Sequence, residues 1–109
     1  MTTNDFVIVD AKISFAASKN VGYRTRTEQR YRVFVNFLQE NDLVTREILS
    51  AEDPVTEELQ IRKSDLTDEG FELVKNAYDK WLRGIDKGKE IADVSVLNKA
   101  LSKIREGSP

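Results

Sequence analysis

The stretch LTDEGFELVKNAYDKWLRGIDKG, residues 66–88, carries the strongest structural pattern in the chain. Its apolar residues recur at spacings of three and four, which is the pattern of the buried face of an amphipathic helix. The stripe consists of Phe71, Val74, Tyr78, Trp81 and Ile85, and is widened by Ala77 and Leu82. We therefore expect a helix over residues 68–87 at the centre of the core, with Trp81 buried inside it.

Capping residues and charges mark both ends of this helix. Asp65 or Thr67 can cap its start, because either side chain can accept a hydrogen bond from a backbone amide of the first turn. Acidic residues fill the first turns and basic residues the last ones, and both placements are favourable in the field of the helix dipole. Gly88 is a typical C-terminal stop.

A further helix is expected on either side of this segment. The downstream helix begins after Asp93, and its apolar residues have the same spacing: Val94, Leu97, Leu101 and Ile104. The upstream helix extends over 26–41, because Thr25 and Glu28 have the spacing of a capping box. Its apolar stripe comprises Tyr31, Phe34, Val35 and Leu38. The preceding residues, 18–24, are expected to form a loop.

Three other segments have features of β-strands. Residues 5–15 are rich in Val, Ile and Phe and alternate in polarity, although their spacing is also compatible with a helix. Residues 43–49 and 59–63 alternate as well, with the polar stretch 50–56 between them. We expect two antiparallel strands joined by an exposed loop, and a short helix at 45–51 is the alternative for the first of them.

These elements predict an α+β fold, in which a small antiparallel sheet packs against three helices in the order β-α-β-β-α-α. With 109 residues, of which 39% are hydrophobic, the chain has the usual size and composition of one domain. We expect residues 1–109 to form that single domain.

The composition narrows the chemistry that the chain can perform. It has no histidine and no cysteine, which excludes disulfides and thiolate metal sites. The carboxylates of Asp65, Asp68, Glu69 and Glu72 could bind a hard cation, but the start of a helix also favours them for structural reasons. No phosphate-binding or nucleophile motif is present. We expect a non-catalytic protein without metal or cofactor.

The hydropathy pattern argues against a membrane protein. The longest apolar runs are short, such as Phe6 to Val9, whereas a membrane span needs about 20 apolar residues. The first residues lack the basic and then apolar pattern of a secretory signal. We expect a cytoplasmic protein.

Charge is distributed unevenly along the chain. Segment 19–32 carries five cations and one carboxylate, a net charge of +4, whereas segment 40–58 carries seven carboxylates and one arginine, a net charge of −6. Segments of opposite sign can steer a charged partner. The alternative interpretation is that both are solvated faces, which could also face each other within the fold.

One functional hypothesis is nucleic-acid binding. The two predicted strands, followed by LTDEG at 66–70 and a long helix, resemble the wing and following helix of bacterial MarR-type regulators. The resemblance implies a winged helix, but only one helix is predicted before the wing, where a helix-turn-helix is required. The stretch 50–56 bears Glu52 and Asp53, which phosphate would repel, so binding to nucleic acid is not expected. The basic, tyrosine-containing segment 19–32 keeps RNA binding as an alternative.

The hypothesis that we favour is protein binding. As a small acidic domain without catalytic motifs, the chain is similar in general form to bacterial toxin-immunity proteins, on the residues of the acidic run 40–58 and of the block 65–82. The resemblance implies an inhibitor whose acidic surface occupies the basic cleft of a toxin. The expected partner-binding residues are Asp42, Glu47, Glu52, Asp53, Glu57 and Glu58. A structural adaptor or a homodimer is the remaining alternative.

Overall fold

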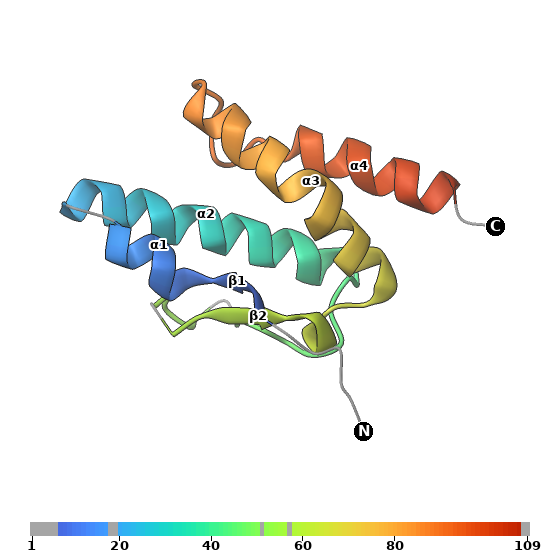
Figure 1. Ribbon diagram of the computed structural model, residues 1–109, viewed down its shortest axis with the longest axis horizontal. Helices are drawn as coiled ribbons and strands as arrows, with labels where there is room; N and C mark the ends of the chain where they lie inside the picture. Colours follow the sequence, from blue (N-terminus) through green and yellow to red (C-terminus); the bar gives the residue numbers. More distant parts are fainter. Residues whose placement is uncertain (1–6, 18–19, 51, 57, 108–109) are drawn as a thin grey trace.

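The computed structural model describes residues 7–17, 20–50, 52–56 and 58–107 (Figure 1). Helix α3, Asp68–Asp86, lies between two other helices. It packs against α2, Val21–Glu40, through aromatic rings: the ring of Phe34 lies 4.6 Å from that of Tyr78 and 5.6 Å from that of Trp81. On its other side α3 packs along α4, Ser95–Glu106.

The ends of α3 form as the sequence predicts. Thr67 is its N-cap, and the Thr67 hydroxyl accepts a hydrogen bond from the Gly70 amide at 3.1 Å. The chain leaves the helix through Gly88, whose φ of 111° favours glycine over residues with a side chain. Trp81 is only 1% exposed, so its predicted place in the core is confirmed. The predicted helix after Asp93 is confirmed as α4.

Helix α2 begins earlier than the sequence predicts. Its N-cap is Asn20, whose side chain accepts a hydrogen bond from the Tyr23 amide at 2.8 Å. The expected capping box at Thr25 and Glu28 is therefore wrong, as is the expected loop over the described part of 18–24, because an asparagine cap is available upstream. The predicted apolar stripe of α2 is buried.

The N-terminal segment divides into a strand and a helix. β1 spans Val7–Asp10 and is followed directly by α1, Ala11–Ala17. The Asp10 carboxylate accepts a hydrogen bond from the Lys12 amide at 3.0 Å at this junction. The strand expected over 5–15 is thus correct only for its first half, and residues 5 and 6 lie outside the described part of the chain.

The sheet has two antiparallel strands, and its pairing differs from the expected one. β2, Gln60–Arg62, pairs with β1 in a register that places Val9 opposite Ile61. The expected partner, 43–49, forms no strand and makes one isolated bridge, between Val44 and Leu66. Two backbone amides of this segment, those of Ile48 and Leu49, are instead bonded by a side chain of α2.

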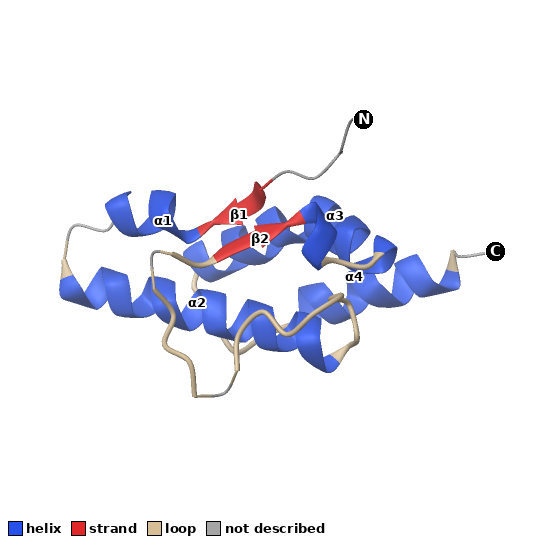
Figure 2. Cartoon of the chain, turned by 90° about the horizontal axis from the view of Figure 1, so that it is seen from below, coloured by secondary structure: helices blue, strands red, loops and turns tan. Residues whose placement is uncertain are grey.

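The fold class is α+β, with an antiparallel sheet, as predicted. Over the described residues, the order of strands and α-helices is β-α-α-β-α-α rather than β-α-β-β-α-α, and four α-helices rather than three surround the core. A short 3-10 helix, Lys63–Asp65, joins β2 to α3. The sheet lies on one side of α2, and α4 lies on the other (Figures 1 and 2). No helix in the described ranges is long and apolar enough to cross a membrane.

Candidate functional site

The segment between α2 and β2, residues 41–59, forms no helix or named strand over its described residues, 41–50, 52–56, 58 and 59, and we call this segment the acidic loop. It exceeds the length of about 12–15 residues beyond which irregular loops in compact domains are uncommon, and such long loops are in general either functional or disordered linkers. Figure 2 shows it as the extended loop that runs beside α2. It contains all six of the residues that the sequence predicts for partner binding.

The first anchor of the acidic loop is Gln39, in the last turn of α2. Its side-chain oxygen accepts hydrogen bonds from the amides of Ile48 at 2.7 Å and Leu49 at 2.9 Å. Its side-chain nitrogen donates to the carbonyl of Leu49 at 2.8 Å. One amide side chain therefore satisfies the backbone groups that a neighbouring strand would otherwise pair.

The second anchor is Arg32, also on α2. Its guanidinium donates to the carbonyl of Ser50 at 2.9 Å and to the carbonyl of Asp53. The Asp53 carboxylate in turn accepts from the Ser50 amide at 3.0 Å and closes a tight turn. The bond from the Ser50 backbone, followed by the Ser50 side chain and the charge of Arg32, holds the pKa of Asp53 below its ordinary value.

Apolar side chains hold the loop as well. Leu43, Leu49, Val55 and Leu59 are each 9% exposed or less and belong to the core. The expectation that 50–56 is wholly exposed is therefore wrong at Val55. Since polar and apolar anchors alternate along the loop, its backbone is fixed to the scaffold at several points.

The six predicted site residues fall into separate groups. Asp53 and Glu58 line a wide, open hollow of about 490 Å³ between the acidic loop and β2. Glu47 and Glu52 are exposed beside it without lining it. Asp42 stands apart at the end of α2, in a left-handed conformation with φ of 58°. Glu57 lies outside the described residues.

The hollow is not purely acidic, because Arg46 and Arg62 line it together with the carboxylates. The nearly buried carboxylate of Asp65 accepts from Arg46 Nε at 2.8 Å and from the Arg62 amide at 2.9 Å. The sequence indicates neither these arginines nor the two anchors as parts of the site. Arg32 belongs to the basic run, and Gln39 stands out in no local pattern.

Several arginines of the basic segment 19–32 make contacts with other parts of the same chain. Arg24 lies over the ring of Phe15 at 5.2 Å, and Arg30 lies 5.9 Å from the ring centroid of Tyr23. Arg32 binds the acidic loop, so the basic and acidic segments do meet at this position. Lys19 lies outside the described residues.

Two helices precede the acidic loop, where the sequence predicts only one. α1 ends at Ala17 and α2 begins at Val21, so a short connection joins them. The first turns of α2 are exposed, and they carry Tyr23, Arg24 and Arg26. The argument against a winged helix that only one helix precedes the loop therefore no longer holds. The acidic loop, however, lies against α2.

The described residues contain no group of three or more acidic side chains placed to hold a metal ion. Two of the acidic residues at the start of α3 form ion pairs with basic side chains. Glu69 pairs with Arg105 at 3.3 Å and Glu72 pairs with Lys75 at 3.5 Å. A structural role at the helix start explains their position.

Comparison with known proteins identifies no relative: no protein-family model, no curated protein and no solved structure matches the chain.

Proposed function

We propose that this chain is a non-catalytic protein-binding domain that docks its acidic loop on a basic surface of a protein partner. The observation that carries the proposal is the double fixation of the loop by Gln39 and Arg32, which leaves Glu47, Glu52 and Glu58 exposed. A binding loop fixed in advance loses less conformational entropy on association, so more of the contact energy appears as affinity.

The charge of the loop supports the same proposal. Exposed carboxylates attract a basic partner over long range and raise the association rate. The hollow beside the loop offers a place for one long cationic side chain of the partner, because Asp53 and Glu58 both line it.

The more specific form of the proposal is an inhibitor of the toxin-immunity type. A nuclease toxin has a basic cleft that binds phosphates, and an acidic loop held in one conformation can occupy such a cleft in place of the nucleic acid. We expect this complex to form in the cytoplasm. The absence of histidine and cysteine agrees with a role in binding rather than in acid–base or nucleophilic chemistry.

The test is capture of the partner from the native host by wild-type protein and by a charge-reversed variant. The variant replaces Glu47, Glu52 and Glu58 with lysine and leaves Asp53 in place, because Asp53 closes the turn with Ser50. A control with the same change in charge carries lysine at the exposed positions Asp79, Asp86 and Glu90. We expect the variant to lose a partner that the control and the wild type retain.

Folding must be measured in the same experiment. Because the three replaced side chains are exposed, the melting temperature of the variant should stay within a few degrees of that of the wild type. Capture of the same partner in equal amounts by the wild type and the loop variant would contradict the proposal. Inhibition of the captured partner by the wild-type protein would support the more specific form.

A second candidate function is nucleic-acid binding by α2, and the presence of α1 before α2 favours it. In helix-turn-helix proteins the N-terminal residues of the second helix contact the bases. Titration of labelled duplex DNA and single-stranded RNA at several salt concentrations tests this function. Binding that falls with salt and is lost on Arg24→Glu and Arg26→Glu, but not on Arg83→Glu, would support it.

A further inference from the structure

A second surface lies on the other side of the molecule, in a groove between α3 and α4. Its volume is about 400 Å³. Its floor is aliphatic and consists of Ala77 from α3 and of Val96, Ala100 and Ile104 from α4. The three residues of α4 recur at every fourth position, so they form one continuous row along the helix. Asn76 completes the α3 side.

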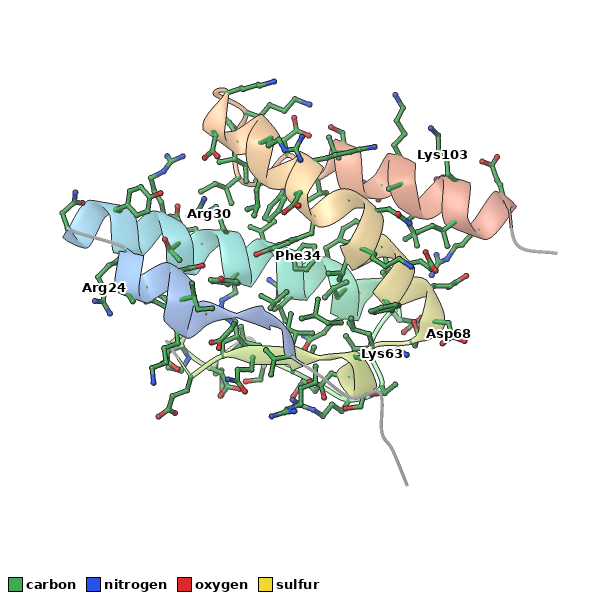
Figure 3. The ribbon with its side chains drawn as sticks, in the orientation of Figure 1. Arg24, Arg30, Phe34, Lys63, Asp68 and Lys103 are labelled. Carbon is green, nitrogen blue, oxygen red and sulfur yellow. The ribbon has the colours of Figure 1, made fainter. Side chains whose placement is uncertain are left out.

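Lysines line both edges of this groove. Lys80 stands on the α3 side, and Lys99 and Lys103 stand on the α4 side. All three are exposed, and Figure 3 shows Lys103 projecting from α4 away from the rest of the molecule. None of them forms an ion pair with another described residue, and no carboxylate lines the groove.

We infer that this groove, which we call the lysine groove, binds an acidic amphipathic helix of a partner protein. The apolar row of α4 from Val96 to Ile104 spans about 12 Å at 1.5 Å per residue, which matches about two turns of a docked helix. The small side chain of Ala100, which is half-buried, allows the backbone of that helix to come close. Helices bound in such grooves place apolar residues at every third or fourth position on the floor.

The edge charges determine which helix fits. Ammonium groups on both sides of an aliphatic floor require a partner helix with aspartate or glutamate on both sides of its apolar stripe. The aliphatic floor would contribute little to the binding of a nucleic acid, because it has neither aromatic rings on which bases can stack nor polar groups that hydrogen-bond to base edges. The proposal is independent of the acidic loop, because the two surfaces share no lining residues.

The test uses a fluorescein-labelled peptide with leucine at every third or fourth position and glutamate at the flanking positions. A scrambled peptide of the same composition is its control. Anisotropy should show saturable binding of the amphipathic peptide to the wild-type protein and much weaker binding of the scrambled one. Increasing salt should weaken the binding, because exposed edge charges contribute to it.

Three variants assign the binding to the groove. Replacement of Lys80, Lys99 and Lys103 with glutamate should raise the Kd by about tenfold or more, which corresponds to about 1.4 kcal/mol. Replacement of three exposed lysines outside the groove, Lys12, Lys87 and Lys89, with glutamate makes the same change in net charge and should leave the Kd nearly unaltered. Ala100→Gln, which places a polar side chain on the floor, should also weaken the binding.

Four results would overturn the inference. The first two are equal affinity of the groove and control lysine variants for the peptide, and equal affinity of the wild-type protein for the amphipathic and the scrambled peptide. The third is binding of labelled duplex DNA or anionic vesicles, through the same three lysines, that is tighter than binding of the peptide. The fourth is a homodimer, detected by light scattering, that the groove variant abolishes. The last two would assign the groove to a different occupant. Circular dichroism of each variant verifies that it remains folded.

Discussion

The side chain of Gln39 is bonded to both backbone groups of Leu49. Its nitrogen donates to the Leu49 carbonyl at 2.8 Å, and its oxygen accepts from the Leu49 amide at 2.9 Å. This is the pattern that one residue of a β-strand makes with its neighbour, here completed by a helix side chain. The pairing holds the middle of the acidic loop beside α2 without any strand.

Loss of this pairing should release the loop. In Gln39→Ala the half-buried amides of Ile48 and Leu49 lose their acceptor, so we expect the free energy of unfolding to fall by about 2 kcal/mol. Hydrogen exchange at these two amides should accelerate by more than the global loss of stability explains. Gln29→Ala, at an exposed position of the same helix, should change stability by less than about 0.5 kcal/mol. Unchanged exchange at both amides would contradict the anchoring role.

Two glycines in helices should respond to alanine with opposite signs. A Cβ on Gly70 would overlap the carbonyl oxygen of Leu43, which is backbone and cannot turn aside. We expect Gly70→Ala to destabilise the fold by about 2–3 kcal/mol. A Cβ on Gly22 would meet only the side-chain oxygen of Asn20 at 3.5 Å, so Gly22→Ala should stabilise the fold by about 0.5–1 kcal/mol. Chemical denaturation of both variants measures the contrast.

The turn at Asp53 should weaken in acid. The bond from the Ser50 backbone, then the Ser50 side chain and Arg32, lowers the pKa of Asp53 in the folded state from its ordinary value of 3.8. A lowered pKa means that the folded state favours the carboxylate. Its contribution to stability is thus complete above the ordinary pKa and is lost as the pH falls through the lower folded-state pKa.

Comparison of the wild type with Asp53→Asn tests this dependence, because asparagine keeps a side-chain acceptor and does not titrate. The stability advantage of the wild type over the variant should shrink as the pH is lowered through the acidic range. A difference that is independent of pH would contradict the assignment. Measurement of the carboxyl chemical shift of Asp53 by NMR gives the folded-state pKa directly.

The single tryptophan reports on the packing of α3. Trp81 is 1% exposed, and its indole nitrogen donates to the carbonyl of Asp93 at 3.2 Å, ahead of α4. Its emission should be blue-shifted and insensitive to iodide in the native state. Trp81→Phe removes this hydrogen bond and leaves a cavity, so we expect a loss of about 2–3 kcal/mol. Native-state quenching equal to that of the unfolded chain would contradict the burial.

The parts of the fold that the sequence predicts well are those whose determinants are local. The cap of α3 at Thr67, its apolar stripe and the stop at Gly88 all lie within or beside the helix itself. The start of α2 was harder to predict, because its cap, Asn20, stands beside Gly22 in a stretch that has the composition of a loop. Glycine lowers helix propensity by about 1 kcal/mol, and one good cap can compensate for it.

The pairing of the sheet and the anchors of the site depend on contacts between distant residues. Leu43 and Leu49 are buried, as alternation over 43–49 predicts for the two ends of the segment, but the pattern does not reveal that Gln39 supplies the backbone partners. Likewise, the charge of 19–32 suggests a binding surface, whereas the Arg32 side chain is bonded to backbone carbonyls of the acidic loop. The exposed acids of the loop were predictable, but the side chains that fix their positions were not.

The anchors of the acidic loop bind its main chain rather than its outward side chains. Gln39 and Arg32 contact carbonyl groups, which every residue has, and amide N–H groups, which every residue except proline has, so they do not require particular residues at positions 47, 52 and 58. Recognition can therefore change by substitution at these positions while the backbone path stays the same. A set of homologues with different binding specificities should retain both anchors and diverge on the outer side of the loop, much as antibody loops diversify on a constant framework.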